Sequence, residues 1–186
     1  MIPLLTIWLE RMLAIYPPLI GIYALYYKGL VKKEVHMGHI SPGDKVLCIG
    51  GGPLPCTAME IARTTGAKVD VVDICPIAVG ISRKIVKHRG LDQQITIRLA
   101  RGEELNCSDY TVIHVARQVQ PRHEILANIR QNARRGARII LRLPHQSLRL
   151  LYDTLDRRCW HMDCLLANNN CEETSLLLVK QGGSLV

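Results

Sequence analysis

Strand-type and helix-type segments alternate along most of this chain, and the alternation restricts the fold more than any other feature of the sequence. Apolar runs of strand length are separated by segments whose apolar residues recur every three or four positions. We expect strands at residues 45–49, 68–72, 94–98, 110–115 and 137–142, and helices at 56–65, 76–89, 121–135 and 145–157. Such alternation predicts a doubly wound α/β fold, a parallel sheet with helices on both faces.

The two ends of the chain depart from this alternation. Residues 1–40 carry two helical apolar stripes and are expected to form an N-terminal helical cap that precedes the main domain at 41–186. The stripes either pack against the sheet or form a lid that brings Tyr16, Tyr23, Tyr26 or Tyr27 to a substrate pocket. Near the other end, residues 160–167 and 174–180 are predicted to form an antiparallel hairpin with its turn at Asn168–Asn170.

The net charge of +8 over 186 residues raises the question of a polyanionic partner. Arginines are concentrated between Arg117 and Arg158, but that stretch holds only one aromatic residue, Tyr152, so it lacks the stacking surfaces that single-stranded nucleic acids need. A solvated basic face is favoured over a nucleic-acid site.

The cysteines indicate a reduced environment. There are seven, an odd number without the rhythm of a disulfide scaffold, and no leader sequence is recognised, so we expect free thiols in a cytoplasmic protein. Cys159, His161, Cys164 and Cys171 form a conceivable ligand set, but their spacing matches no strong zinc pattern. Buried thiols are favoured, and no metal is expected.

The apolar N-terminal segment is not expected to span a membrane. Glu10 and Arg11 interrupt it, and the pair Pro17-Pro18 breaks it before about 20 apolar residues accumulate.

The turn after the first predicted strand is the expected ligand site, because open parallel sheets bind ligands beyond the carboxyl ends of their strands. It has the sequence Gly50-Gly51-Gly52-Pro53-Leu54-Pro55, which fits neither the dinucleotide fingerprint nor the phosphate-binding loop. Glycines allow close approach of the backbone, whereas each proline removes an N–H that a phosphate would need. The turn therefore favours a nucleoside ligand without a pyrophosphate.

Two acidic segments follow the next strands. Asp73 lies 23 residues after Gly50, where a carboxylate can accept hydrogen bonds from both ribose hydroxyls, and the neighbouring Ile74 could pack on a purine ring. Glu103 could accept a hydrogen bond from an adenine amino group. The alternatives are a surface carboxylate or helix cap for Asp73 and a helix cap for Glu103.

In this order, the glycine turn, the ribose acid, the Gly-acid segment and the terminal hairpin resemble the class I S-adenosylmethionine-dependent methyltransferases. The resemblance implies a seven-stranded, mostly parallel sheet of order 3-2-1-4-5-7-6 with the last strand antiparallel. It also implies S-adenosylmethionine (SAM), an adenosine joined to methionine without a phosphate, as the cofactor. The cofactor-binding residues that it implies are Gly50, Gly51, Gly52, Pro53, Asp73, Ile74, Glu103 and Ala116.

Two positions depart from that family's pattern. Cys48 stands where an acidic residue is common, and Leu54 stands where a third glycine is common. The segment GGGPLPCTA is more similar to nicotianamine synthases, which transfer the aminocarboxypropyl arm of SAM instead of its methyl group.

The sequence therefore predicts a SAM-dependent transferase, with methyl transfer to a small-molecule acceptor as the first hypothesis. Aminocarboxypropyl transfer and a noncatalytic SAM-binding module are the alternatives, and Pro55 together with the terminal hairpin disfavours an NAD-dependent enzyme. No catalytic residue is assigned, although polar side chains are expected near the substrate side, and the N-terminal helices could form a homodimer. These side chains are His114, Arg117, Gln118, Gln120 and His145.

Overall fold

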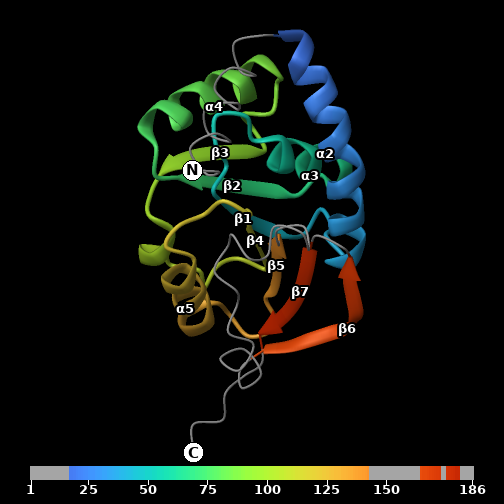
Figure 1. Cartoon of the computed structure of the whole chain (residues 1–186), viewed down its shortest axis with the longest axis vertical. Helices are drawn as coiled ribbons and strands as arrows, with labels where there is room; N and C mark the ends of the chain where they lie inside the picture. The colour runs from blue at the N-terminus through green and yellow to red at the C-terminus, as the bar shows by residue number, and fades with distance from the viewer. Residues whose placement is uncertain (1–16, 143–163, 173–174, 181–186) are drawn as a thin grey trace, which may run out of the picture.

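The computed structural model describes residues 17–142, 164–172 and 175–180, and the fold is a doubly wound α/β structure (Figure 1). The strands are β1 (Lys45–Ile49), β2 (Lys68–Asp73), β3 (Ile95–Leu99), β4 (Val112–Val115), β5 (Arg138–Arg142), β6 (Cys164–Glu172) and β7 (Ser175–Lys180). The helices are α2 (Pro17–Met37), α3 (Cys56–Thr65), α4 (Pro76–His88) and α5 (Arg122–Asn132), with a 3-10 turn η1 (Gly102–Glu104).

The strands lie in the order β3-β2-β1-β4-β5-β7-β6. Strands β1 to β5 pair in parallel, and β7 runs antiparallel to both β5 and β6. The α/β class and the mostly parallel sheet predicted from the sequence are thus confirmed.

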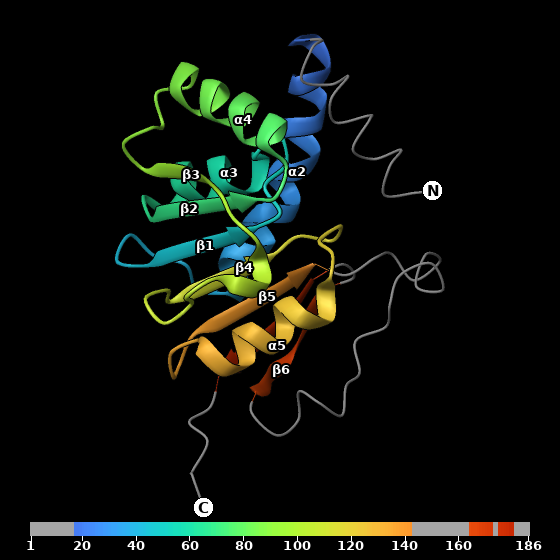
Figure 2. The ribbon, with the colours of Figure 1, turned by 90° about the vertical axis from the view of Figure 1, so that its left-hand side faces the viewer.

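Helices cover both faces of the sheet, with α2, α3 and α4 on one side and α5 on the other (Figure 2). Alternate residues of a strand point to opposite faces, so Val46 and Cys48 of β1 pack with α2 and α3, whereas Leu47 and Ile49 face α5. Both faces of β1 are buried, as expected for a central parallel strand.

The asparagine triplet does not form the predicted turn. Strand β6 continues from Cys164 to Glu172 and includes Asn168–Asn170, so the link to β7 falls at residues 173–174, outside the described part of the chain. The pairing register shifts between Leu166 and Cys171, which places the triplet in the irregular part of the strand. Asparagine tolerates such irregular backbone as well as it tolerates turns, which explains why the sequence was misread.

Other predictions fall outside the described residues. They concern the first N-terminal helix, the helix at 145–157 with His145, and the tyrosine at position 16; the side chains of Tyr23 and Tyr26 are likewise outside the description. Among the helices that the structure does describe, none combines the length and apolar character needed to cross a membrane.

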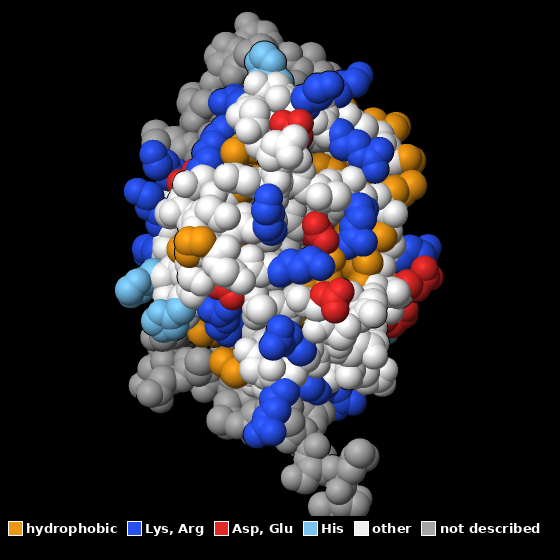
Figure 3. All heavy atoms as spheres, turned by 180° about the vertical axis from the view of Figure 1, so that it is seen from behind, with side chains coloured by type: hydrophobic (Ala, Val, Ile, Leu, Met, Phe, Trp, Pro, Cys, Tyr) orange, Lys and Arg blue, Asp and Glu red, His pale blue; other side chains and the backbone are white. Residues whose placement is uncertain are grey.

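Basic residues are distributed singly on the face shown in Figure 3, with acidic side chains among them. The arginine-rich stretch 117–158 lies partly outside the described residues, so the solvated basic face stays a prediction.

Candidate functional site

The glycine turn lies between β1 and α3, at the carboxyl edge of the sheet, and it uses its own N–H donors internally. The N–H groups of Gly50 and Gly51 both donate to the carbonyl oxygen of Val72, at 2.9 and 3.2 Å. The N–H of Gly52 donates to Oδ2 of Asp73 at 2.8 Å. Since the two prolines of the turn have no N–H, the turn lacks the converging donors of a phosphate cradle.

Packing requires glycine at two of these positions. A Cβ on Gly51 would lie 2.1 Å from Cγ1 of Val71, and one on Gly50 would lie 2.4 Å from Cγ1 of Val119. Gly50 also has a φ of 84°, in the left-handed region that side chains disfavour. The glycines therefore let the turn sit directly on β2 and on the loop after β4.

Asp73 connects the turn to the start of α4. Its Oδ2 accepts from Gly52, and its Oδ1 accepts from the N–H of Cys75 at 2.9 Å. Each carboxylate oxygen can accept a further hydrogen bond, so these contacts leave capacity for a ligand hydroxyl. Ile74 is 59% exposed beside it, with an accessible apolar surface.

Glu103 lies in η1 with its side chain 12% exposed. Its Oε1 accepts from Nε of Arg101 at 2.9 Å, whereas its Oε2 is buried and has no hydrogen-bond partner among the described residues. A buried carboxylate oxygen without a donor is costly, which fits an acceptor site that a ligand completes.

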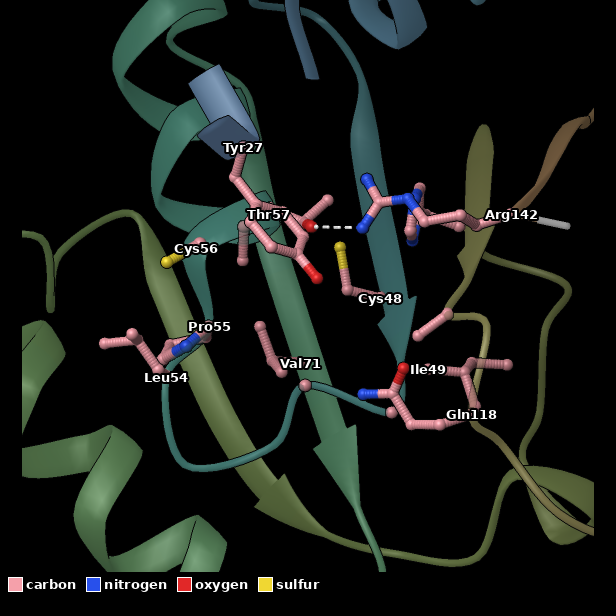
Figure 4. A pocket seen from close by; sticks show the side chains of 15 residues that line it. Tyr27, Cys48, Ile49, Leu54, Pro55, Cys56, Thr57, Val71, Gln118 and Arg142 are labelled. Carbon is pink, nitrogen blue, oxygen red and sulfur yellow. Dashed lines mark hydrogen bonds between the residues drawn. The ribbon is translucent and has the colours of Figure 1, made fainter. Parts of the chain in front are cut away.

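A pocket opens next to the glycine turn, on the α2 and α3 side of the sheet (Figure 4). Its lining residues come from α2, the carboxyl ends of β1, β4 and β5, and the start of α3. They are Tyr27, Cys48, Ile49, Gly50, Gly51, Leu54, Pro55, Cys56, Thr57, Ala58, Val71, His114, Ala116, Gln118 and Arg142.

The structure brings only some of the predicted site residues to this pocket. Gly50, Gly51 and Ala116 line it, whereas the segment Gly52–Pro53 and the three residues Asp73, Ile74 and Glu103 do not. Of the polar residues expected near the substrate, His114 and Gln118 line the pocket, and Arg117 and Gln120 do not. Tyr27 also lines it, as in the proposed lid, although α2 packs against the sheet as well.

The pocket wall is backed by a buried polar cluster around Glu34, a residue of α2. Arg142 donates from Nε and Nη2 to the two oxygens of Glu34, at 3.0 and 2.5 Å. Ser175 donates from Oγ to Oε1 of Glu34 at 2.6 Å, and Nε2 of His114 lies 3.3 Å from Oε2. Glu34 and Ser175 are fully enclosed.

This environment fixes the charges of the cluster. Burial alone would raise the pKa of Glu34, but the positive charge and the hydrogen bonds of Arg142 outweigh it and hold that pKa well below the usual range. Burial lowers the pKa of His114, so its imidazole is neutral at neutral pH. Burial also raises the pKa of Cys48 to about 12, so its thiol stays protonated.

Sequence reasoning missed Glu34, Thr57 and Arg142. A signal for Glu34 was present, because this carboxylate lies three residues after Val31 on the apolar stripe of its helix. No such signal marked Arg142 at the end of an apolar strand.

The four residues considered and disfavoured as metal ligands cannot be placed, because Cys159 and His161 lie outside the described residues and the side chains of Cys164 and Cys171 are not described. Across the part of the chain that is described, no three His, Cys, Asp or Glu residues are grouped as metal ligands would be.

Comparison with known proteins identifies the family. The family model described as "Nicotianamine synthase protein" matches residues 15–167. The chain belongs to the nicotianamine synthase family. A relative in this comparison is L-histidine 2-aminobutanoyltransferase of Pseudomonas aeruginosa, which is 34% identical over 113 residues, 60% of this chain and 43% of that protein. The chain thus matches less than half of this relative's length.

Solved structures agree with membership of the nicotianamine synthase family. A variant of MtNAS in complex with S-adenosylmethionine has a TM-score of 0.70 at 26% identity and covers 84% of this chain and 62% of that chain. An RNA methyltransferase from Salinibacter ruber in complex with S-adenosyl-L-homocysteine has a TM-score of 0.61 at 16% identity, over 85% of this chain and 95% of that one. The fold is that of the class I SAM-dependent methyltransferase superfamily, as the sequence predicted.

Proposed function

We propose that this protein is a SAM-dependent transferase that moves the aminocarboxypropyl arm of SAM to a nitrogen atom of a small amino-acid-like acceptor. Membership of the nicotianamine synthase family carries this proposal, and the name of the Pseudomonas relative is consistent with it. The glycine turn supports SAM as the ligand, because the N–H groups of its three glycines are used internally and SAM brings no phosphate that would need them.

The residues around the turn fit the parts of SAM. Asp73 would hold the ribose, Ile74 would pack on the purine, and the buried Oε2 of Glu103 would accept from the adenine amino group. Gly50, Gly51, Gly52, Pro53 and Ala116 would border the methionine end.

Bound SAM would supply a sulfonium, a built-in leaving group for attack by a nucleophile. In the proposed reaction the acceptor nitrogen bonds to Cγ of the arm, the Cγ–S bond breaks, sulfur keeps the electron pair, and the nitrogen loses a proton. The pocket would contribute by orienting the acceptor and by excluding water from the reacting atoms.

Both parts of the predicted domain division would contribute to this site. Tyr27 and Glu34 belong to the 1–40 segment, whereas the glycine turn and Arg142 belong to 41–186. We therefore propose that the N-terminal segment is a functional component of the transferase.

The products should distinguish the reactions that SAM allows. Incubation of the full chain with SAM and a panel of amino acids should give methylthioadenosine, because cleavage at Cγ leaves the methyl group on sulfur. Chromatography with mass detection measures the nucleoside product. S-adenosylhomocysteine as the main product would instead identify a methyltransferase, and SAM binding without turnover would identify a noncatalytic module.

Asp73→Ala should weaken SAM binding by about 10- to 100-fold in calorimetric titration, because a carboxylate that accepts ligand hydroxyls contributes about 1.5–3 kcal/mol. Asp70→Ala is the matched control, since Asp70 lies on the same strand but bonds Tyr110 and Arg98. Equal SAM affinity in the Asp73 variant and the control would remove Asp73 from the ribose site.

A further inference from the structure

Arg142 differs in charge from the other residues that line the pocket. Of the residues that line the described pocket, it is the only one with a full charge at neutral pH, because Cys48 is protonated and His114 is neutral. Its side chain is only 4% exposed, and Figure 4 shows its guanidinium reaching from β5 toward Thr57 and Cys48. Glu34 already pairs with this cation from behind, so Arg142 can offer an anionic group of a ligand the N–H donors that face the pocket.

The guanidinium is held rigidly from behind. Nε and Nη2 bond Glu34, Nη1 donates to Oγ1 of Thr57 at 3.2 Å, and the Tyr27 ring lies 5.1 Å from Cζ. These contacts use one hydrogen on each nitrogen, and each Nη carries a second hydrogen. Glu34 does not line the pocket, so it neutralises and orients Arg142 without occupying the ligand space.

The place of Arg142 relative to the glycine turn indicates which anion it would meet. Gly50, Gly51 and Ala116 line the same pocket and are the residues proposed for the methionine end of SAM. A carboxylate matches the two-donor geometry of a guanidinium. In SAM it is accompanied by an ammonium and a sulfonium, and in an amino-acid acceptor by an ammonium, so its entry would not leave excess negative charge beside Glu34.

We propose that Arg142 binds the carboxylate of an amino-acid group in this pocket, and that Glu34 and Ser175 are positioning residues that fix its guanidinium. This proposal rests on the proposed transferase function. The carboxylate belongs either to the arm of SAM or to the acceptor, and the two sources can be separated by choice of ligand.

The test uses the double variant Glu34→Gln with Arg142→Met in the full chain. Arg142→Met alone would leave Glu34 as a buried unpaired carboxylate and could unfold the protein, whereas the double variant removes both charges. The matched control is Asp44→Asn with Arg138→Met, which also removes both charges of a pair, because Arg138 lies at the opposite end of β5 and pairs with Asp44 outside the pocket. Thermal unfolding confirms that each variant is folded.

Calorimetric titrations then compare SAM with methylthioadenosine, which keeps the adenosine and lacks the arm. If Arg142 binds the SAM carboxylate, the double variant should weaken SAM binding by about 10- to 100-fold and leave methylthioadenosine unaffected. If the carboxylate belongs to the acceptor, SAM binding stays intact and the affinity for L-histidine, titrated with methylthioadenosine present, falls by a similar factor. The control variant of Asp44 and Arg138 should retain all three affinities.

The proposal is overturned if the folded double variant binds every carboxylate-bearing ligand as tightly as the wild type does. It is also overturned if the double variant loses as much affinity for methylthioadenosine as for SAM. Failure of the proposed function gives a different result in the wild-type chain, which would then bind no SAM, or would bind SAM and give S-adenosylhomocysteine or no nucleoside product instead of methylthioadenosine.

Discussion

Glu34→Ala is expected to lower the free energy of unfolding by about 3–5 kcal/mol, the usual cost of leaving one partner of a buried ion pair unpaired. The substitution leaves Arg142 without its carboxylate and removes the acceptor of the Ser175 hydroxyl. Urea unfolding followed by circular dichroism measures the change. The effect is large because all three residues are almost fully buried, so water cannot replace the lost contacts.

Glu104→Ala is the control for this substitution. Glu104 pairs with Arg101 on the surface, where its side chain is 70% exposed, and such pairs contribute at most about 1 kcal/mol.

The contribution of Glu34 to the free energy of unfolding should also depend on pH. Because its pKa is lowered in the folded protein, the contribution is present above the ordinary glutamate value of about 4.3 and is lost as the pH falls below it. A Glu34→Ala cost no larger than that of Glu104→Ala would contradict a stabilising role for the cluster.

Local chemistry explains how much of the fold could be predicted from the sequence. The bounds of β1 and α3 were predicted correctly because turn residues flank both: Pro42 and Gly43 precede the strand, and the glycine turn separates it from the helix. The Asn168–Asn170 turn was predicted wrongly because the same local chemistry is compatible with an irregular strand, and pairing with β7 decided the outcome.

In the candidate site, too, some residues could be predicted from the sequence and others could not. The glycine turn and Asp73 are predicted as site residues because residue type and spacing mark them within one strand–helix–strand unit. The pair formed by Glu34 and Arg142 could not be found, because 108 residues separate its members and only the packing of α2 on β5 brings them together. The place of Glu34 on an apolar stripe indicates that its carboxylate is buried, but nothing in the sequence marks Arg142 as its partner.

Gly51→Ala is expected to destabilise the protein by about 1–3 kcal/mol, the usual cost of overpacking a well-filled core. The added Cβ would lie 2.1 Å from Cγ1 of Val71, so the turn or the strand must move. Val71 is 1% exposed, and its β-branched side chain has little rotamer freedom with which to escape. Since the displaced turn carries the hydrogen bond from Gly52 to Asp73, SAM affinity should fall with stability.

Two pairs of variants separate steric overlap from backbone strain as the cause. Gly51 lies outside the positive-φ region, and a new Cβ would be 3.7 Å from Cβ of Val71, an ordinary contact. In a Val71→Ala background, Gly51→Ala should therefore cost less than about 0.5 kcal/mol. Gly50→Ala should still cost about 1–2 kcal/mol in a Val119→Ala background, because the φ of 84° at Gly50 disfavours a side chain and the new Cβ would still lie 3.2 Å from Cβ of Ala116. If the smaller side chain that replaces valine removes the cost of alanine at both glycine positions, the glycines are required for space alone. If it removes the cost at neither position, contacts other than those with β2 and the loop after β4 hold the turn.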